Sequence, residues 1–149
     1  MTIVPLVNKA SPTEPAMRIR GGPRIARLAS GPVPAREDVA AFRAALRHLA
    51  GGVSVITTGR GEDRTGLTAT SVGSLSAEPP TLMFGLNLAS SSFPVLTRHR
   101  SFAVNFLNAA QKQIADRFAG RGGEKGAARY AGANWSTGPK GVPAVGGAM

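Results

Sequence analysis

Two clusters rich in hydroxyl side chains, one on each side of an apolar segment, are the part of this chain best suited to chemistry. Their members are Thr68, Ala69, Thr70 and Ser71 in the first cluster, and Asn87, Ser90, Ser91 and Ser92 in the second. Hydroxyls and backbone amides at this density, with no carboxylate among residues 64–77, suit a ligand with many hydrogen-bond acceptors and one phosphate. The two clusters therefore predict binding of a flavin nucleotide.

The second cluster directly precedes a predicted short helix. Pro94 falls in the first turn of this helix, where proline is favoured. Free backbone amides and the positive end of the helix dipole attract a phosphate, and neighbouring serine hydroxyls add donors. The alternative is a serine that caps the helix beside two serines that bind nothing. This segment alone leaves both interpretations open.

Composition sets outer limits on the function. A chain of 149 residues with 42% hydrophobic content is expected to form one domain with an ordinary core. The absence of cysteine excludes disulfides, thiolate metal sites and a cysteine nucleophile. No apolar run is long enough to cross a bilayer, and the first residues lack a signal-peptide pattern. We therefore expect a cytoplasmic protein without a membrane partner.

The net charge of +10 is unevenly distributed along the chain. Residues 1–36 contain six of the eighteen bases and one of the eight acids, together with several prolines. This pattern predicts a disordered basic leader over residues 1–36, followed by one domain over residues 37–149. Few aromatic residues accompany the bases of that domain, so we expect no nucleic-acid partner. A basic nucleic-acid-binding module is kept as an alternative.

The apolar pattern places the elements that must position the hydroxyl clusters. Asp38 begins a predicted amphipathic helix that docks on a core through Val39, Phe42, Leu46 and Leu49. Strands are predicted over residues 53–58, 66–72, 81–86 and 102–107, the first two as a hairpin. A short helix follows Ser92, another helix covers residues 109–118, and an irregular tail contains Trp135.

This order favours a mainly β fold with peripheral helices, in which an antiparallel sheet closes on itself as a barrel. Four strands cannot close a barrel. We therefore expect either that a partner subunit covers the open edge or that the sequence stops before the last strands.

Residues from about 42 to 149 resemble the flavin reductase-like, FMN-binding split-barrel family, the reductase components of two-component flavin monooxygenases. The matching segments are residues 42–46, 50–58, 66–71, 75–82, 90–92, 102–107 and 115–119. Their order and spacing together are specific, although each segment alone is not. The resemblance implies a Greek-key split β-barrel that is truncated at the C-terminus of this chain.

The resemblance also implies a role for each matching residue. Residues 68–71 would line the isoalloxazine and ribityl chain, and Asn87 with residues 90–92 would hold the ribityl and phosphate end. Phe102 and Ala103 would lie near the flavin. The implied reaction is hydride transfer from NADH or NADPH to the N5 atom of FMN, or of FAD. A homodimer would then supply reduced flavin to a separate flavin-dependent monooxygenase.

The chain departs from the family pattern after the segment of residues 146–149. Family members continue through several more strands, which include a Gly-Asp-His motif that helps to seat the nicotinamide. An alternative function is therefore a flavin-binding protein without reductase activity. The two histidines are not expected to replace the motif: His48 is predicted on a helix surface, and His99 beside Arg98 is predicted to complement a helix dipole. Tyr130 and Trp135 are predicted to be packing residues.

Overall fold

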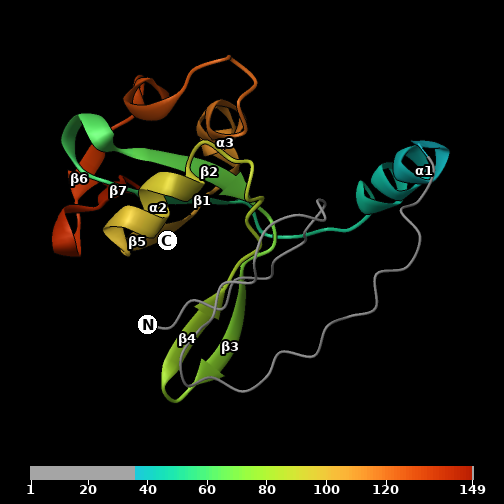
Figure 1. Cartoon of the computed structure of the whole chain (residues 1–149), viewed down its shortest axis with the longest axis horizontal. Helices are drawn as coiled ribbons and strands as arrows, with labels where there is room; N and C mark the ends of the chain where they lie inside the picture. The colour runs from blue at the N-terminus through green and yellow to red at the C-terminus, as the bar shows by residue number, and fades with distance from the viewer. Residues whose placement is uncertain (1–35, 149) are drawn as a thin grey trace, which may run out of the picture. The chain divides into compact units, whose positions relative to one another are not determined.

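Figure 1 shows the computed structural model of the chain, which describes residues 36–148. The leader predicted for residues 1–36 thus lies, apart from Arg36, outside the described residues. The chain divides into two units, and the described part of the smaller unit contains helix α1 (Arg36–Leu46). This helix begins before Asp38, and its Phe42 and Leu46 side chains are exposed. The docking of α1 on a core stays a prediction.

The described part of the larger unit contains three antiparallel sheets. The first sheet has the order β2 (Thr65–Ala69), β1 (Ser54–Thr58), β5 (Phe102–Phe106); the second pairs β3 (Gly73–Ala77) with β4 (Pro80–Met83); the third pairs β6 (Trp135–Thr137) with β7 (Pro143–Val145). The predicted hairpin of the first two strands is confirmed by the β1–β2 register, in which Val55 lies opposite Thr68. A mainly β fold with helices is also confirmed.

Three details of the strand prediction are wrong. Strand β3 was not expected, because its glycine, serine and alanine residues have little strand propensity. The strand predicted over residues 81–86 ends at Met83, and the tail predicted to be irregular contains β6 and β7. The described strands form three separate sheets, and a closed barrel is not seen among them.

The helices of the larger unit lie close to their predicted positions. Helix α2 (Phe93–His99) begins directly after Ser92 with Pro94 in its first turn, as predicted. The helix predicted over residues 109–118 is a 3₁₀ turn followed by α3 (Lys112–Phe118). The turn starts at Asn108, whose side chain accepts a hydrogen bond from Ala110 N while the Gln111 side chain accepts one from Asn108 N. This reciprocal capping explains why the segment starts at Asn108.

Each face of the central sheet carries its own core. Because side chains alternate along a strand, Ile56 and Val55 point to opposite faces. Ile56 packs with Ala69, Phe84 and Leu96 in one buried cluster. Val55 packs with Phe118 and Tyr130 in the other, where the ring centroids of Phe118 and Tyr130 lie 5.1 Å apart. The chain after β4 and helix α2 therefore contribute to one face, while α3 and the following turn contribute to the other.

Asn105 joins the third sheet to the central one. Its Nδ2 donates to Val55 O at 2.9 Å, and its Oδ1 accepts from Val145 N at 2.9 Å. Thr57, also fully buried, donates its hydroxyl to Pro143 O. Buried polar side chains thus help to anchor the short strand β7 against β1 and β5.

Candidate functional site

Ser92 connects the start of helix α2 to strand β2. Its side chain is fully buried, and its hydroxyl donates to Gly66 O at 2.8 Å and lies 3.2 Å from Thr65 Oγ1. The same side chain makes no capping hydrogen bond to α2. The Ser92 hydroxyl is therefore used inside the protein, which gives this member of the predicted site a structural contact.

The other members of the second cluster fold their own loop. Asn87 Oδ1 accepts from Ala89 N at 2.9 Å, and Ser90 N donates to Asn87 O at 2.9 Å. Ser90 Oγ in turn accepts from Ser92 N at 3.3 Å. These local bonds leave the side chains of Asn87 and Ser91 exposed. The loop is thus fixed in shape while it presents polar groups to solvent.

The first cluster is divided between three environments. Thr68 donates its hydroxyl to Ala115 O of helix α3, whereas Ala69 is buried on the opposite face of the sheet with Ile56. Thr70 and Ser71 follow the end of β2 and are exposed. Ser71 Oγ accepts from Gly85 N at 2.9 Å. Only Thr70 and Ser71 of this cluster therefore offer exposed side chains.

One residue of each cluster ties the segment of residues 85–92 to β2 or to the chain that follows it. Gly85 is bonded to Ser71 beyond the last residue of β2, and Ser92 is bonded to Gly66 near its first residue. The segment of residues 85–92 is consequently held beside the strand at both ends. The exposed side chains of Asn87 and Ser91 lie within this segment, and the exposed Ser71 is bonded to its first residue. The segment contains no charged residue.

Phe102 and Ala103 point to opposite faces of the central sheet. They lie on β5, where Phe102 is opposite Thr58 and Ala103 is opposite Thr57 in β1. Phe102 packs its ring against Phe84 at a centroid distance of 5.1 Å, so it supports the start of the 85–92 segment. Ala103 points to the other face of the sheet, because neighbouring residues of a strand alternate.

An ion-pair cluster that was not predicted from the sequence holds the C-terminal end of helix α2. Asp63 accepts two hydrogen bonds from Arg98 Nη2, at 2.5 and 2.6 Å, and lies 2.6 Å from His99 Nε2. The hydrogen bond with His99, followed by those with Arg98, lowers the pKa of Asp63 below its usual value. Arg98 and His99 lie in the last turn of α2 as predicted, but they have a specific carboxylate partner.

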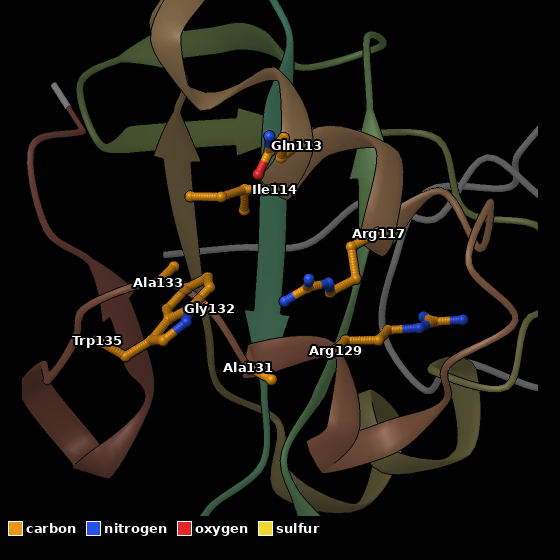
Figure 2. A pocket seen from close by; sticks show the side chains of 8 residues that line it. All are labelled: Gln113, Ile114, Arg117, Arg129, Ala131, Gly132, Ala133 and Trp135. Carbon is orange, nitrogen blue, oxygen red and sulfur yellow. The ribbon is translucent and has the colours of Figure 1, made fainter.

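A shallow pocket lies on the α3 side of the sheet (Figure 2). It is lined by Gln113, Ile114, Arg117, Arg129, Ala131, Gly132, Ala133 and Trp135. Figure 2 shows the Arg117 side chain directed into the space between α3 and the 131–135 segment, while Arg129 extends away from it. Arg129 donates to Gly66 O and to Glu124 O, so it connects this side to β2. None of the lining residues is acidic.

Tyr130 and Trp135 are packing residues, as predicted. Tyr130 is buried and donates its hydroxyl to Thr65 O at 2.6 Å, and Trp135 donates its Nε1 to Tyr130 O at 2.9 Å. Among residues 36–148, no group of three His, Asp or Glu side chains is arranged to hold a metal ion. None of the helices in that range has the length and apolar character needed to span a bilayer.

The sequence of this chain is similar to that of flavin reductase-like proteins. The model of the flavin reductase-like domain matches residues 46–149. The FMN reductase (NADH) RutF of Stutzerimonas stutzeri (strain A1501) is 42% identical over 113 residues, which cover 76% of this chain and 62% of that protein. The chain therefore spans less than two thirds of the length of this relative.

Two solved structures are similar at the level of the fold and of the sequence. BorF, the flavin reductase component of a bacterial two-component tryptophan halogenase, has a TM-score of 0.67 and 28% identity, covering 75% of this chain and 70% of that one. The second structure is the Streptomyces globisporus C-1027 NADH:FAD oxidoreductase SgcE6 in complex with NAD and FAD fragments. It has a TM-score of 0.66 and 27% identity, and the match covers 79% of this chain and 69% of that one. The family model matches residues 46–149, which are more than half of this chain. The chain therefore belongs to the flavin reductase-like domain family.

Proposed function

We propose that this protein is a flavin reductase that transfers hydride from NADH to FMN. The observation that carries the proposal is the neutral segment of residues 85–92, which Ser71 and Ser92 fix beside the free edge of β2. Asn87 and Ser91 within this segment, and Thr70 and Ser71 after β2, have exposed polar side chains. The names of the relatives, FMN reductase (NADH) among them, support the same function.

The residues of this edge fit a flavin nucleotide in chemical type. Ser90 and Ser91 would donate hydrogen bonds to the phosphate, and Asn87 would contact the ribityl hydroxyls. Thr70, Ser71 and the backbone of residues 68–69 would contact the polar edge of the isoalloxazine. Ser92 is a positioning residue in this arrangement, because its hydroxyl is bonded to Gly66 O.

The flavin supplies the hydride-accepting atom, and the protein supplies binding and alignment. Phe102 would support the site from below through Phe84 rather than touch the flavin. Ala103, on the opposite face of β5, would act through the packing of the sheet. Alignment and exchange of the flavin require no acid–base group, so a neutral site is sufficient for this reaction.

Several finer parts of the proposal extend beyond the flavin site. We include FAD as a second flavin and NADPH as a second hydride donor. The reductase works as a homodimer with the split-barrel fold of its family in the cytoplasm, and it supplies reduced flavin to a flavin-dependent monooxygenase. The structure of BorF, a reductase component of a two-component system, supports the last point.

Flavin titration tests the site. Quenching of FMN fluorescence should saturate with a dissociation constant of about micromolar, because a reductase must release its product flavin and so cannot bind it very tightly. Replacing Ser90 and Ser91 together by alanine should weaken FMN binding by about tenfold or more and change riboflavin binding by less than about twofold, because only FMN carries the phosphate. Ser136→Ala, which removes an exposed hydroxyl on β6, serves as the control. Equal losses for both flavins would exclude the serines from a phosphate site.

Oxidation of NADH in the presence of FMN tests the reaction itself. The proposed reductase oxidises NADH only when flavin is added. Saturable FMN quenching without NADH oxidation would instead identify the alternative function, a flavin-binding protein without reductase activity. Absence of quenching by a folded sample would contradict the flavin site altogether.

A further inference from the structure

Both ends of helix α2 are bonded to one short stretch of the chain around the start of β2. At the N-terminal end, Ser92 donates its hydroxyl to Gly66 O at 2.8 Å. At the C-terminal end, Arg98 Nη2 donates to both carboxylate oxygens of Asp63, at 2.5 and 2.6 Å, and His99 Nε2 lies 2.6 Å from Asp63 Oδ2. The helix therefore lies beside this stretch, and Asp63 is one of its two points of attachment.

The lengths of the two segments match. Helix α2 has seven residues, which extend over about 10 Å at a rise of about 1.5 Å per residue. Residues 63–66 extend over about the same distance, because an extended chain rises by about 3.3 Å per residue. Both attachments can therefore be made at once by a straight helix.

The orientation of α2 depends on such attachments. An isolated helix of this length is not stable in water, and α2 buries only one of its own residues, Leu96. Just beyond the helix, Thr58 donates its hydroxyl to Ser101 O at 2.8 Å, which fixes where the helix ends. The contacts of Asp63 are made instead to side chains of the last helical turn. They therefore restrict the rotation of the helix about its own axis.

The serine loop, residues 90–92, is coupled to the helix by its own hydrogen bonds. Ser90 Oγ accepts from Ser92 N at 3.3 Å, and Ser90 O accepts from Phe93 N at 3.0 Å. A rotation of the helix therefore moves Ser90 and the adjacent Ser91 with it. These are the two serines that the proposed function assigns to the flavin phosphate.

We propose that Asp63 is a positioning residue for the serine loop. Through its hydrogen bonds to α2 it fixes the orientation of the helix, and the helix holds the loop in the geometry that binds the phosphate of FMN. This inference rests on the proposed function and gives a role to a residue that does not touch the flavin. A carboxylate in contact with the phosphate would repel it, whereas Asp63 lies at the opposite end of the helix and is paired with Arg98.

Titrations of the full chain with FMN and with riboflavin at neutral pH test this role. Asp63→Asn should raise the dissociation constant of FMN by about three- to tenfold, because serines in the wrong orientation bind the phosphate poorly. Riboflavin binding should change by less than about twofold, because riboflavin has no phosphate. Glu62→Gln removes the same charge from the adjacent exposed residue of the turn and should leave both dissociation constants unchanged.

A second variant separates the position of the loop from the charge of Asp63. Arg98→Gln removes a positive charge, whereas Asp63→Asn removes a negative one. If these residues acted on the phosphate through charge alone, the two variants would change FMN affinity in opposite directions. Loss of a shared contact should weaken FMN binding in both variants, and the double variant should bind FMN no more weakly than the weaker single variant. Opposite changes, or an unchanged dissociation constant in Asp63→Asn, would overturn the proposal.

Hydrogen exchange measures the loop in the absence of any ligand. In Asp63→Asn the amides of Ser90, Ser92 and Phe93 should exchange at least about threefold faster than in the wild type, because the bonds that protect them open more often. The amides of β1, at the centre of its sheet, should not change. Glu62→Gln should alter neither group of amides. Unchanged serine-loop amides in Asp63→Asn would show that α2 keeps its orientation without this carboxylate, and would overturn the proposal.

Steady-state oxidation of NADH separates this inference from the proposed function. Asp63→Asn should raise the KM for FMN and leave kcat at saturating FMN within about twofold of the wild-type value, because the weakened contact binds the flavin without taking part in hydride transfer. A wild type that binds no FMN and oxidises no NADH would refute the proposed function, and with it the role of Asp63 in phosphate binding. A wild type that reduces FMN with a KM that Asp63→Asn does not change would support the function and overturn the inference.

Discussion

Ser92 and Arg129 donate hydrogen bonds to the same atom, the backbone oxygen of Gly66. Ser92 reaches it from the serine loop before helix α2, and Arg129 reaches it from the 3₁₀ turn Gly126–Tyr130. A carbonyl oxygen has two lone pairs and can accept both bonds. Strand β2 is consequently fixed to two segments that are far apart in the sequence, and its free edge acquires a defined position beside residues 85–92.

Ser92→Ala should destabilise the protein through the loss of a buried hydrogen bond. Gly66 O keeps its bond from Arg129, but the buried Thr65 hydroxyl loses its neighbour. We expect a decrease of about 1–3 kcal/mol in the free energy of unfolding, measured by urea denaturation. Ser91→Ala removes an exposed hydroxyl of the same loop and should leave this free energy within about 0.5 kcal/mol of the wild-type value. Equal stability of the two variants would contradict the structural role of Ser92.

Gly66→Ala should destabilise the protein through overpacking beside β1 and Phe118. A Cβ atom at Gly66 would lie 2.5 Å from Ile56 O and 2.7 Å from Phe118 Cε1. The backbone oxygen cannot move without disrupting the β1–β2 pairing, so overpacking should lower the free energy of unfolding by about 1–3 kcal/mol or more. Gly52→Ala has no atom within 4 Å of the added carbon and provides the matched control. Thermal melting of both variants compares them directly.

Asp63→Asn should change how stability depends on pH. Hydrogen bonds from His99 and Arg98 lower the pKa of Asp63 in the folded protein. A carboxylate with a lowered folded pKa stabilises the protein above its unfolded pKa, about 3.9, and this contribution is lost as pH falls through the folded value. Wild type should therefore melt at a higher temperature than Asp63→Asn at pH 6, and the difference should shrink below about pH 4.

The control for Asp63 is Glu62→Gln, which neutralises the adjacent exposed carboxylate of the same turn. Its melting temperature should follow the wild-type pH dependence. A constant difference between wild type and Asp63→Asn from pH 6 to pH 3 would show that the ion pairs with α2 contribute no pH-dependent stability.

The sequence was sufficient for features that depend on neighbours in the chain. The β-branched residues of 53–58 predicted β1, and the turn of residues 59–63 predicted its pairing with β2. Pro94 after three serines predicted the start of α2. These features follow from local pattern, because strand propensity and proline geometry act within a few residues.

Features that depend on distant contacts were not predictable in the same way. Three adjacent serines carry no signal of which hydroxyl points inward, so the burial of Ser92 could be seen only in the structure. The contact between Asp63 and His99 joins residues 36 positions apart. Strands β6 and β7 have three residues each, which is too short for an alternating pattern to be recognised. Pairing and the Asn105 hydrogen bonds fix β7 instead.

Asn105→Ala should separate the third sheet from the central one. The substitution removes the acceptor of Val145 N and the donor to Val55 O, and it leaves both backbone groups in a buried region without these partners. We expect a loss of about 1–3 kcal/mol in the free energy of unfolding, because the buried Val145 N is left unsatisfied while Val55 keeps its backbone pairing with residue 105. Hydrogen exchange of the Val145 amide should accelerate more than that of the Ile56 amide, since β1 keeps its pairing with β2. Thr97→Ala, which removes an exposed side-chain hydrogen bond within α2, provides the control and should leave Val145 exchange much less affected. Equal acceleration at Val145 and Ile56 in Asn105→Ala would mean that the two sheets open together and that Asn105 does not hold β7 locally.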